Sequence, residues 1–244
     1  MEKTIFLTCV LFAYFDLFTL SVHSLVVNDL VIPVCPTNIT LSNFSLSSGN
    51  GFPTYDTKVE LCQQQSSTPN VYDLFVKFDM FDENPSSPYT KCNQPLYEYD
   101  SVEMFIAAYN PNDNENMYPT TYFEFEMNPN GALFASLITN TCDDCSCITG
   151  VLQSCTNTND IPYYQAQIYD NNSWSAVLVV SVQWITENTY PNATNIEETH
   201  LRANFYRIDV LNNGEEYEYS SWNPTYKDPP CFHVPSSFGY FSLS

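Results

Sequence analysis

Hydrophobic and polar residues alternate along several short segments of this chain. In residues 71–81, VYDLFVKFDMF, one face of an extended segment carries Tyr72, Leu74, Val76, Phe78 and Met80. In residues 101–108, SVEMFIAA, Val102, Met104 and Ile106 share one face, and Glu103 and Phe105 share the other. A period of two residues is typical of a β-strand with one buried face.

A third segment, TYFEFEM (121–127), repeats this pattern with charged residues between aromatic ones. The alternation predicts that Phe123, Phe125 and Met127 are buried. The opposite face of the strand carries Glu124 and Glu126, which we expect to be exposed.

Other segments support the same fold class. Residues 176–184 form a nearly continuous apolar run, which indicates a strand buried on both faces and places Trp184 in the core. Asn213-Gly214 lies between two strand-like runs and is a strong hairpin signal. No amphipathic helix longer than a turn or two is predicted. We therefore expect an all-β protein, an antiparallel, jelly-roll-like β-sandwich stapled by disulfides.

The first 24 residues have the features of a secretory signal peptide. Lys3 precedes an apolar run over 5–20, and small residues stand near position 24. Asp16 is unusual in such a run, which leaves a retained anchor as the alternative. We expect residues 25–244 to form a single domain, because all-β domains of this length are common. They contain no apolar run long enough to span a bilayer.

Eight cysteines follow the expected cleavage site: Cys35, Cys62, Cys92, Cys142, Cys145, Cys147, Cys155 and Cys231. An even number in an exported chain predicts up to four disulfides. The cluster CDDCSC (142–147) also allows a zinc knuckle, but no second cysteine pair or pair of histidines lies near it. Disulfides are the favoured interpretation.

Four Asn-x-Ser/Thr sites are candidates for N-glycosylation: Asn38, Asn43, Asn171 and Asn192. With the signal peptide and the cysteines, they predict a secreted, extracellular glycoprotein.

The chain is strongly acidic, with a formal charge of −21. Removal of residues 1–24 leaves 26 acids and 6 bases, a charge of −20. Such a chain repels phosphate backbones, so nucleic-acid binding is excluded. The charge indicates either a solvated acidic surface or attraction of cations such as calcium. Asp79, Asp82 and Glu83 are weak candidates for a structural calcium site; the loop 110–118 lacks the ligand order of a calcium-binding loop. No other cofactor is expected.

Several segments occur in the order found in one known family: NVYDLFVKFDMFDE, LYEYDSVEMFI, TYFEFEMNPNGALF, RANFYRID, YSSWNPT and FHVPSSFGYFSL. Together they resemble carbohydrate-binding module family 9-like domains, and the resemblance covers roughly residues 52–244. It implies a β-sandwich that binds poly- or oligosaccharides at one edge. A sugar site needs flat aromatic rings for the C–H faces and polar groups for the hydroxyls.

The resemblance also implies a ligand site. Tyr97 and Phe232 match two aromatics that clamp the sugar, and Glu103 matches a strand carboxylate that contacts its hydroxyls. Glu124 and Glu126 stand where sugar-binding members offer Arg and Asn. Trp222 matches an aromatic near the site. Each residue also has a structural interpretation: Tyr97 as a surface aromatic, Phe232 and Trp222 as packing residues, and Glu103 as a structural carboxylate.

Catalysis is not expected. Glu98, Asp100 and Glu103 invite comparison with a glycosidase, but such enzymes place two carboxylates on opposite sides of a cleft, and these three share one short segment. His200 and His233 have no evident nucleophile partner. We predict a secreted, non-catalytic carbohydrate-binding module; the alternative is a structural or interaction glycoprotein with a degenerate sugar site. An open groove between Tyr97 and Phe232 would distinguish the two.

Overall fold

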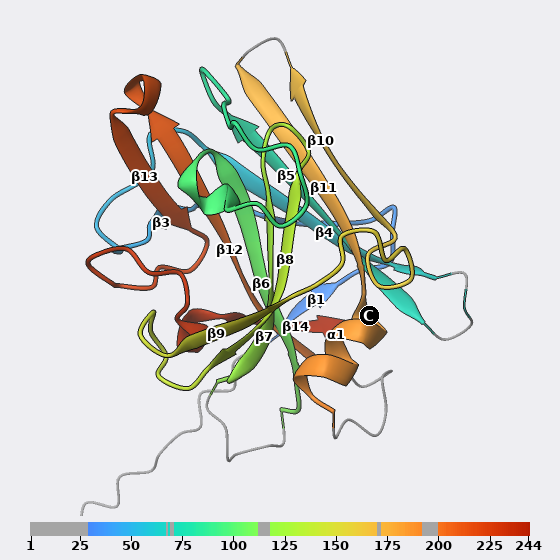
Figure 1. Ribbon diagram of the computed structural model, residues 1–244. Helices are drawn as coiled ribbons and strands as arrows, with labels where there is room; N and C mark the ends of the chain where they lie inside the picture. The colour runs from blue at the N-terminus through green and yellow to red at the C-terminus, as the bar shows by residue number, and fades with distance from the viewer. Residues whose placement is uncertain (1–28, 67, 69–70, 112–117, 170–171, 192–199) are drawn as a thin grey trace, which may run out of the picture.

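The computed structural model of the protein describes residues 29–244 apart from 67, 69–70, 112–117, 170–171 and 192–199. The predicted signal peptide, most of the loop 110–118 and the sequons at Asn171 and Asn192 lie outside the described residues. Two β-sheets form a sandwich, as the alternation predicts (Figure 1).

The larger sheet has nine strands. Its main path runs β1 (Leu30–Ile32), β14 (Gly239–Leu243), β12 (His200–Leu211), β6 (Ser101–Tyr109), β7 (Thr121–Met127), β8 (Leu133–Asn140) and β9 (Ile148–Leu152). The first part of β12 pairs with β14, and its last part pairs with β13 (Glu216–Ser221), which in turn pairs with β3 (Ser45–Leu46). The pairing of β1 with β14 is parallel, and the other strand pairs of the sandwich are antiparallel.

The smaller sheet has five strands in the order β10 (Tyr163–Tyr169), β11 (Ser173–Ser181), β5 (Tyr72–Phe81), β4 (Thr57–Gln65) and β2 (Ile39–Leu41). Its inner face packs against the inner face of the larger sheet. The predicted inward residues of 71–81, 101–108 and 121–127 meet in this core, with Tyr72 partly buried at its margin. The prediction that Phe123, Phe125 and Met127 are buried is therefore confirmed.

The prediction of a strand over 176–184 is only partly right. Strand β11 ends at Ser181, and α1 (Val182–Thr189) follows it directly. The Ser181 side chain caps this helix by accepting a hydrogen bond from the Trp184 backbone N–H at 3.3 Å. Trp184 still packs against the core, with its ring 4.1 Å from that of Phe123. Within the described residues, no helix is long and apolar enough to cross a membrane.

The predicted hairpin is confirmed. Strands β12 and β13 are antiparallel neighbours joined by a short 3-10 turn, η3 (Asn212–Gly214). Both Asn212 and Gly214 have positive φ angles, of 52° and 98°. The Asn-Gly signal marks this turn because these residue types adopt positive φ most readily.

A second hydrophobic cluster covers the outer face of the larger sheet. It combines Phe105, Tyr122 and Tyr206 from the strands with Phe232 and Phe238 from residues 231–238, which we call the covering segment. The segment includes η4 (Pro235–Ser237) and leads directly into β14. Alternation predicts a solvent-exposed face here, but the covering segment buries it.

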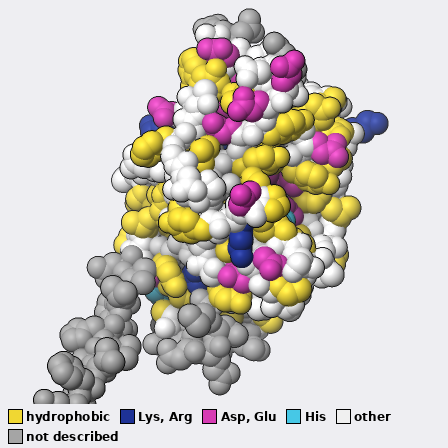
Figure 2. All heavy atoms as spheres, turned by 90° about the vertical axis from the view of Figure 1, so that its left-hand side faces the viewer, with side chains coloured by type: hydrophobic (Ala, Val, Ile, Leu, Met, Phe, Trp, Pro, Cys, Tyr) yellow, Lys and Arg dark blue, Asp and Glu magenta, His cyan; other side chains and the backbone are white. Residues whose placement is uncertain are grey.

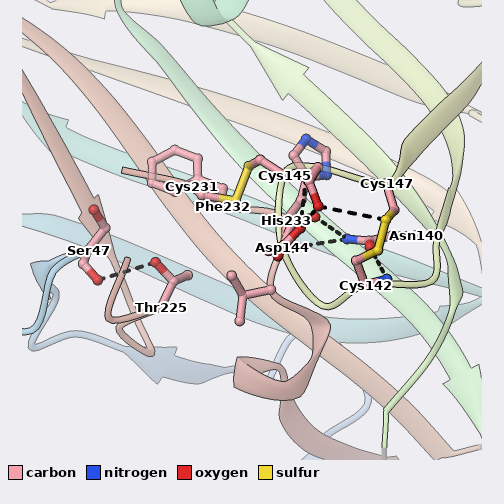
Figure 3. Close-up of a disulfide and its surroundings, with 12 residues drawn as sticks. Ser47, Asn140, Cys142, Asp144, Cys145, Cys147, Thr225, Cys231, Phe232 and His233 are labelled. Atoms are coloured by element: carbon pink, nitrogen blue, oxygen red, sulfur yellow. Dashed lines mark hydrogen bonds between the residues drawn. A yellow bond between two sulfur atoms is a disulfide. The ribbon is translucent and has the colours of Figure 1, made fainter. Parts of the chain in front are cut away.

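The four disulfides join Cys35 to Cys62, Cys92 to Cys155, Cys142 to Cys147, and Cys145 to Cys231. All eight cysteines of the described residues are paired, so the disulfide interpretation of the cluster at 142–147 is confirmed and the zinc alternative is wrong. The pair Cys145–Cys231 ties the covering segment to the loop between β8 and β9 (Figure 3).

Candidate functional site

Three glutamates lie together on the outer face of the larger sheet. Glu103 of β6 stands directly opposite Glu126 of β7, and Glu124 lies on the same face of β7. We call these three residues the carboxyl cluster. Their exposed fractions are 2 % for Glu103, 7 % for Glu124 and 1 % for Glu126. The prediction that Glu124 and Glu126 are exposed is therefore wrong, although their shared face was correct.

The covering segment explains this burial. The Phe232 ring stacks on that of Tyr206 at 4.4 Å, and the Tyr206 hydroxyl donates to the Phe232 carbonyl at 3.0 Å. Asn140 donates to the His233 carbonyl at 2.9 Å, and Ser236 N–H donates to Asp143 at 2.8 Å. Figure 3 shows Phe232 and His233 beside the disulfide that fixes this segment. Phe232 is 7 % exposed, so it does not form an open clamp face.

Burial favours the protonated forms of the carboxyl cluster. Burial, and then the neighbouring carboxyls, raise the pKa of Glu103 and Glu126 well above the ordinary range. Burial raises the pKa of Glu124 to about 8. Among the described residues, Glu103 Oε1 and both Glu126 oxygens have no hydrogen-bond partner, although the Tyr97 backbone N–H opposes part of the rise at Glu126. A protonated carboxyl can donate as well as accept a hydrogen bond.

His233 lies at the edge of this cluster. Its Nε2 atom is 3.5 Å from Glu124 Oε1, and its Nδ1 atom is 2.8 Å from the Tyr122 hydroxyl. Burial lowers the pKa of His233 to about 4, so the ring is neutral at pH 7. The contact with Glu124 is therefore a contact between two neutral groups rather than an ion pair.

Tyr97 occupies an exposed position above this region. It lies in the short 3-10 turn η1 (Leu96–Glu98) and is 52 % exposed. Partial burial of the ring, followed by the nearby charges of Glu98, Glu126 and Glu124, raises the pKa of Tyr97. Those influences indicate that Tyr97 lies near Glu124 and Glu126 of the carboxyl cluster.

An open groove of 420 Å³ runs between η1 and β13. Its lining consists of Tyr97, Glu98, Tyr99, Tyr217 and Tyr219, and we call it the tyrosine groove. Tyr217 is 42 % exposed, and the Tyr219 ring lies 6.0 Å from that of Phe232. The side of the molecule on which β13 lies mixes exposed hydrophobic and acidic side chains (Figure 2). Tyr217 and Tyr219 were not among the predicted site residues, although their spacing of two residues in EYEYSS puts them on one face of a strand.

Trp222 lies next to these strands but points into packing. Its ring is 5.5 Å from that of Phe241 and 6.2 Å from that of Phe205. A Cβ atom at Gly239 would fall 2.4 Å from the Trp222 ring, so only a glycine fits beneath it. These contacts match the packing interpretation of Trp222.

The structure does not bring the three acids of the rejected catalytic hypothesis into one cleft. Glu98 is exposed in the tyrosine groove, and Glu103 belongs to the buried carboxyl cluster. Asp100 is buried and accepts hydrogen bonds from the Ser86 and Val210 backbone N–H groups at 2.6 and 2.7 Å. Burial and nearby Asp82 raise its pKa to about 7.

Asp79 and Asp82, the candidate calcium ligands, lie in different surroundings. Asp79 pairs with Lys77 at 2.7 Å. Asp82 joins Asp100 and Asp209 in a buried group in which one carboxylate oxygen from each residue lies within 4.8 Å of the other two. Arg207 lies beside this group, with Nη2 2.9 Å from Asp209 Oδ2 and 3.3 Å from Asp82 Oδ2. The guanidinium already supplies the positive charge that a calcium ion would bring.

Comparison with known proteins identifies the family. A model of carbohydrate-binding family 9 matches residues 58–243, about three quarters of the chain. The chain belongs to carbohydrate-binding family 9. A protein named "Extracellular protein" from the fungus Arthroderma benhamiae is 24 % identical over 221 residues, which cover 85 % of this chain and 86 % of the fungal protein.

Solved structures of other proteins show the same fold. A candidate carbohydrate-binding protein from Bacteroides uniformis superposes with a TM-score of 0.64 at 13 % identity, covering 88 % of this chain and 97 % of that one. A family 9 module from Caldicellulosiruptor kristjanssonii in complex with cellotriose gives a TM-score of 0.53 at 12 % identity, covering 89 % and 94 % of the two chains. The β-sandwich predicted from the sequence is therefore the family 9 fold.

Proposed function

We propose that this family 9 protein is an exported, non-catalytic module that binds a poly- or oligosaccharide in the tyrosine groove. One observation carries the proposal: Tyr97 and Tyr217 expose their rings on the two sides of an open groove, at the edge that the family resemblance implies. The clamp partner of Tyr97 is then the pair Tyr217 and Tyr219 of β13 rather than Phe232, which lies beneath Tyr219.

The chemistry of the groove suits a sugar ring. Tyrosine faces pack against the C–H faces of a pyranose, and their hydroxyls exchange hydrogen bonds with its rim. The exposed carboxylate of Glu98 accepts hydrogen bonds from sugar hydroxyls. The groove is open rather than enclosed, so it accommodates a chain segment as well as a single ring.

The carboxyl cluster supports the groove from below. In this proposal Glu103, Glu124 and Glu126 are neutral at pH 7 and add no negative charge beneath the ligand. Neutral gluco-oligosaccharides are therefore suitable first ligands, and relatives in this family have been solved with cellotriose and with glucose.

Isothermal titration of the mature protein with a series of cello-oligosaccharides and with a panel of other glycans tests the groove. We expect Tyr97→Ala and Tyr217→Ala each to weaken binding by roughly two- to twelvefold, because an aromatic contact contributes about 0.5–1.5 kcal/mol. Both side chains are exposed, so the melting temperature should not change. Tyr226→Ala is the matched control, because Tyr226 is 74 % exposed and does not line the groove. Equal affinity of the wild type and both groove variants would refute the proposal.

Export is part of the same proposal. The four disulfides require an oxidising compartment, and the predicted signal peptide over residues 1–24 supplies a route to it. Asn38 and Asn43 are both exposed, which glycosylation at these sequons needs. Mass measurement of the secreted protein before and after enzymatic removal of N-glycans tests both points.

A role in protein binding is the second candidate. Two observations favour it: Phe232 is buried, and the end strand β9 exposes Val151 by 65 % and Leu152 by 59 %. Strand β9 pairs with β8 on one side only, so its other edge is available to a partner strand. A glycan panel without any binding at millimolar concentration would favour this function over sugar binding.

A further inference from the structure

A second pocket lies where strands of the five-stranded sheet end beside α1. Figure 1 shows that α1 lies far from β13. Its volume is 520 Å³, within the range of small-molecule sites. It forms where the end of β4, the start of β5, residues 158–162 and α1 meet. We call it the helix pocket, and the argument uses Gln64, Asp73, Asp160, Gln183, Trp184 and Glu187 from its lining.

Three acidic residues, Asp73, Asp160 and Glu187, line this pocket, and no basic residue stands beside them in the described lining. Asp73 is 5 % exposed, and its Oδ1 atom has no hydrogen-bond partner among the described residues. Asp160 accepts a hydrogen bond from the Asn157 side chain, and Glu187 is exposed on α1. Burial raises the pKa of Asp73, and burial with the nearby charge of Glu187 raises that of Asp160. None of the described lining residues is Lys, Arg or His. The described lining therefore supplies no positive charge that would stabilise these acids in their ionised form.

The rest of the lining is polar and aromatic. Gln64 is exposed beside Asp73, its partner in the register of β4 and β5. The Gln183 amide donates to Glu187 at 2.6 Å, which leaves the amide oxygen available. Trp184 adds an aromatic ring between these amides and the core. Amides, carboxylates and an aromatic ring together match a ring that carries several hydroxyl groups.

We infer that the helix pocket binds an amino sugar, a hexosamine whose ammonium group lies against Asp73 and Asp160 and whose hydroxyls contact Gln64 and Gln183. An amine of this type has a pKa near that of an α-amino group, about 7.7–8.0, so it is mostly charged at pH 7. A directly coordinated metal ion does not fit. In the part of the chain that the structure describes, the group of three carboxylates close enough to hold one ion is Asp82, Asp100 and Asp209, which lie elsewhere.

Titration of the mature protein with glucosamine, followed by calorimetry or saturation-transfer NMR, tests this inference. Glucose lacks the amine, and N-acetylglucosamine carries it as a neutral amide, so both should bind at least about tenfold more weakly. Asp73→Asn and Asp160→Asn should each weaken glucosamine binding by about tenfold or more, since each removes a charge-assisted hydrogen bond. Glu215→Gln is the matched control, an exposed acid beside β13.

Additional variants and a second ligand separate the possible outcomes. Tyr97→Ala should leave glucosamine binding unchanged, so a failure of the tyrosine groove and a failure of the helix pocket are distinguishable. Loss of glucosamine binding in Tyr97→Ala but not in Asp73→Asn would overturn the inference. So would putrescine binding as tightly as glucosamine, because that ligand has charge but no hydroxyls. If Asp73→Asn does not fold, Asp160→Asn and Gln183→Ala give the same test: unchanged affinity in both overturns the inference.

Discussion

Replacing Glu124 by Gln should make the protein more stable at pH 8 than the wild type. Glutamine has the shape of a protonated glutamate but cannot ionise. Glu124 is 7 % exposed and shares the carboxyl cluster with Glu103 and Glu126. Any ionisation there places an unpaired negative charge in a buried site, because His233, its nearest base, is neutral above about pH 4.

The size of the effect follows from linkage. The pKa of Glu124 rises from 4.5 to about 8 on folding, and at about 1.36 kcal/mol per pKa unit this difference corresponds to roughly 5 kcal/mol. The folded pKa is raised, so the stabilisation is complete below pH 4.5 and is lost as the pH rises towards 8. Between those limits the unfolded chain loses the proton and the folded protein keeps it, so the free energy of unfolding falls by about 1.36 kcal/mol per pH unit.

His233 acts with the opposite sign. Its pKa falls from 6.5 to about 4 on folding, so its contribution is present above pH 6.5 and is lost as the pH falls to 4. The wild type and Glu124→Gln share this term, as they share that of Asp100. The difference between the two proteins therefore reports Glu124 together with its effect on the neighbouring Glu103 and Glu126.

Urea unfolding of both proteins at pH 5, 6, 7 and 8 measures this difference. We expect the free energy of unfolding of Glu124→Gln, relative to the wild type, to rise by roughly 3–4 kcal/mol from pH 5 to pH 8. Glu98→Gln is the control, because Glu98 is exposed and should give a flat difference. A difference that stays flat for Glu124→Gln as well would show that Glu124 is ionised in the folded protein and would refute the reasoning.

Three further predictions concern stability. Replacing Cys145 and Cys231 together by Ser should lower the free energy of unfolding by about 4–5 kcal/mol, because this pair closes a loop of 86 residues. Replacing Cys142 and Cys147 should lower it by about 2 kcal/mol, because that pair closes a loop of 5. Chemical denaturation of both variants tests this difference. Arg207→Met should lower the free energy of unfolding by about 3–5 kcal/mol, since it leaves Asp82 and Asp209 buried without a counter-ion. EDTA should leave the melting temperature of the wild type unchanged. Thermal melts test both expectations. Ser181→Ala should cost about 1 kcal/mol by removing the cap of α1, measured by urea unfolding with Ser48→Ala as a control.

Much of the fold was predictable because strand alternation is a local property. The pattern in 121–127 correctly placed Phe123 and Phe125 in the core and Glu124 on the opposite face. It could not predict that the opposite face is buried as well. That burial depends on the covering segment, which is held in place by a disulfide to a residue 86 positions earlier. A pattern within seven residues contains no information about such a contact.

The strand prediction over 176–184 was partly wrong for a different reason. A short apolar run is compatible with a buried strand and with a buried helix, and alternation cannot separate them. The deciding residue was Ser181, whose side chain caps the helix that follows. A serine before a helix-compatible segment was a readable signal for this boundary.

The candidate site was predictable in part. The order of motifs marked Tyr97, which the structure exposes beside a groove, and Phe232, which the structure buries. Tyr217 and Tyr219 went unrecognised because their position opposite η1 depends on the pairing of β13 with the end of β12. The acids of the helix pocket come from β5, a loop and α1, and no single segment contains the pattern.

The acidic composition has a different meaning in the folded protein than in the sequence. The charge of −20 for residues 25–244 counts Glu103, Glu124 and Glu126 as ionised. Their raised pKa values favour the uptake of protons on folding, so the covering segment lowers the negative charge of the face beneath Tyr97. The other acids that line a candidate binding site are Glu98 in the tyrosine groove and Asp73, Asp160 and Glu187 in the helix pocket. A neutral sugar in the tyrosine groove and a cationic one in the helix pocket follow from the same distribution of charge.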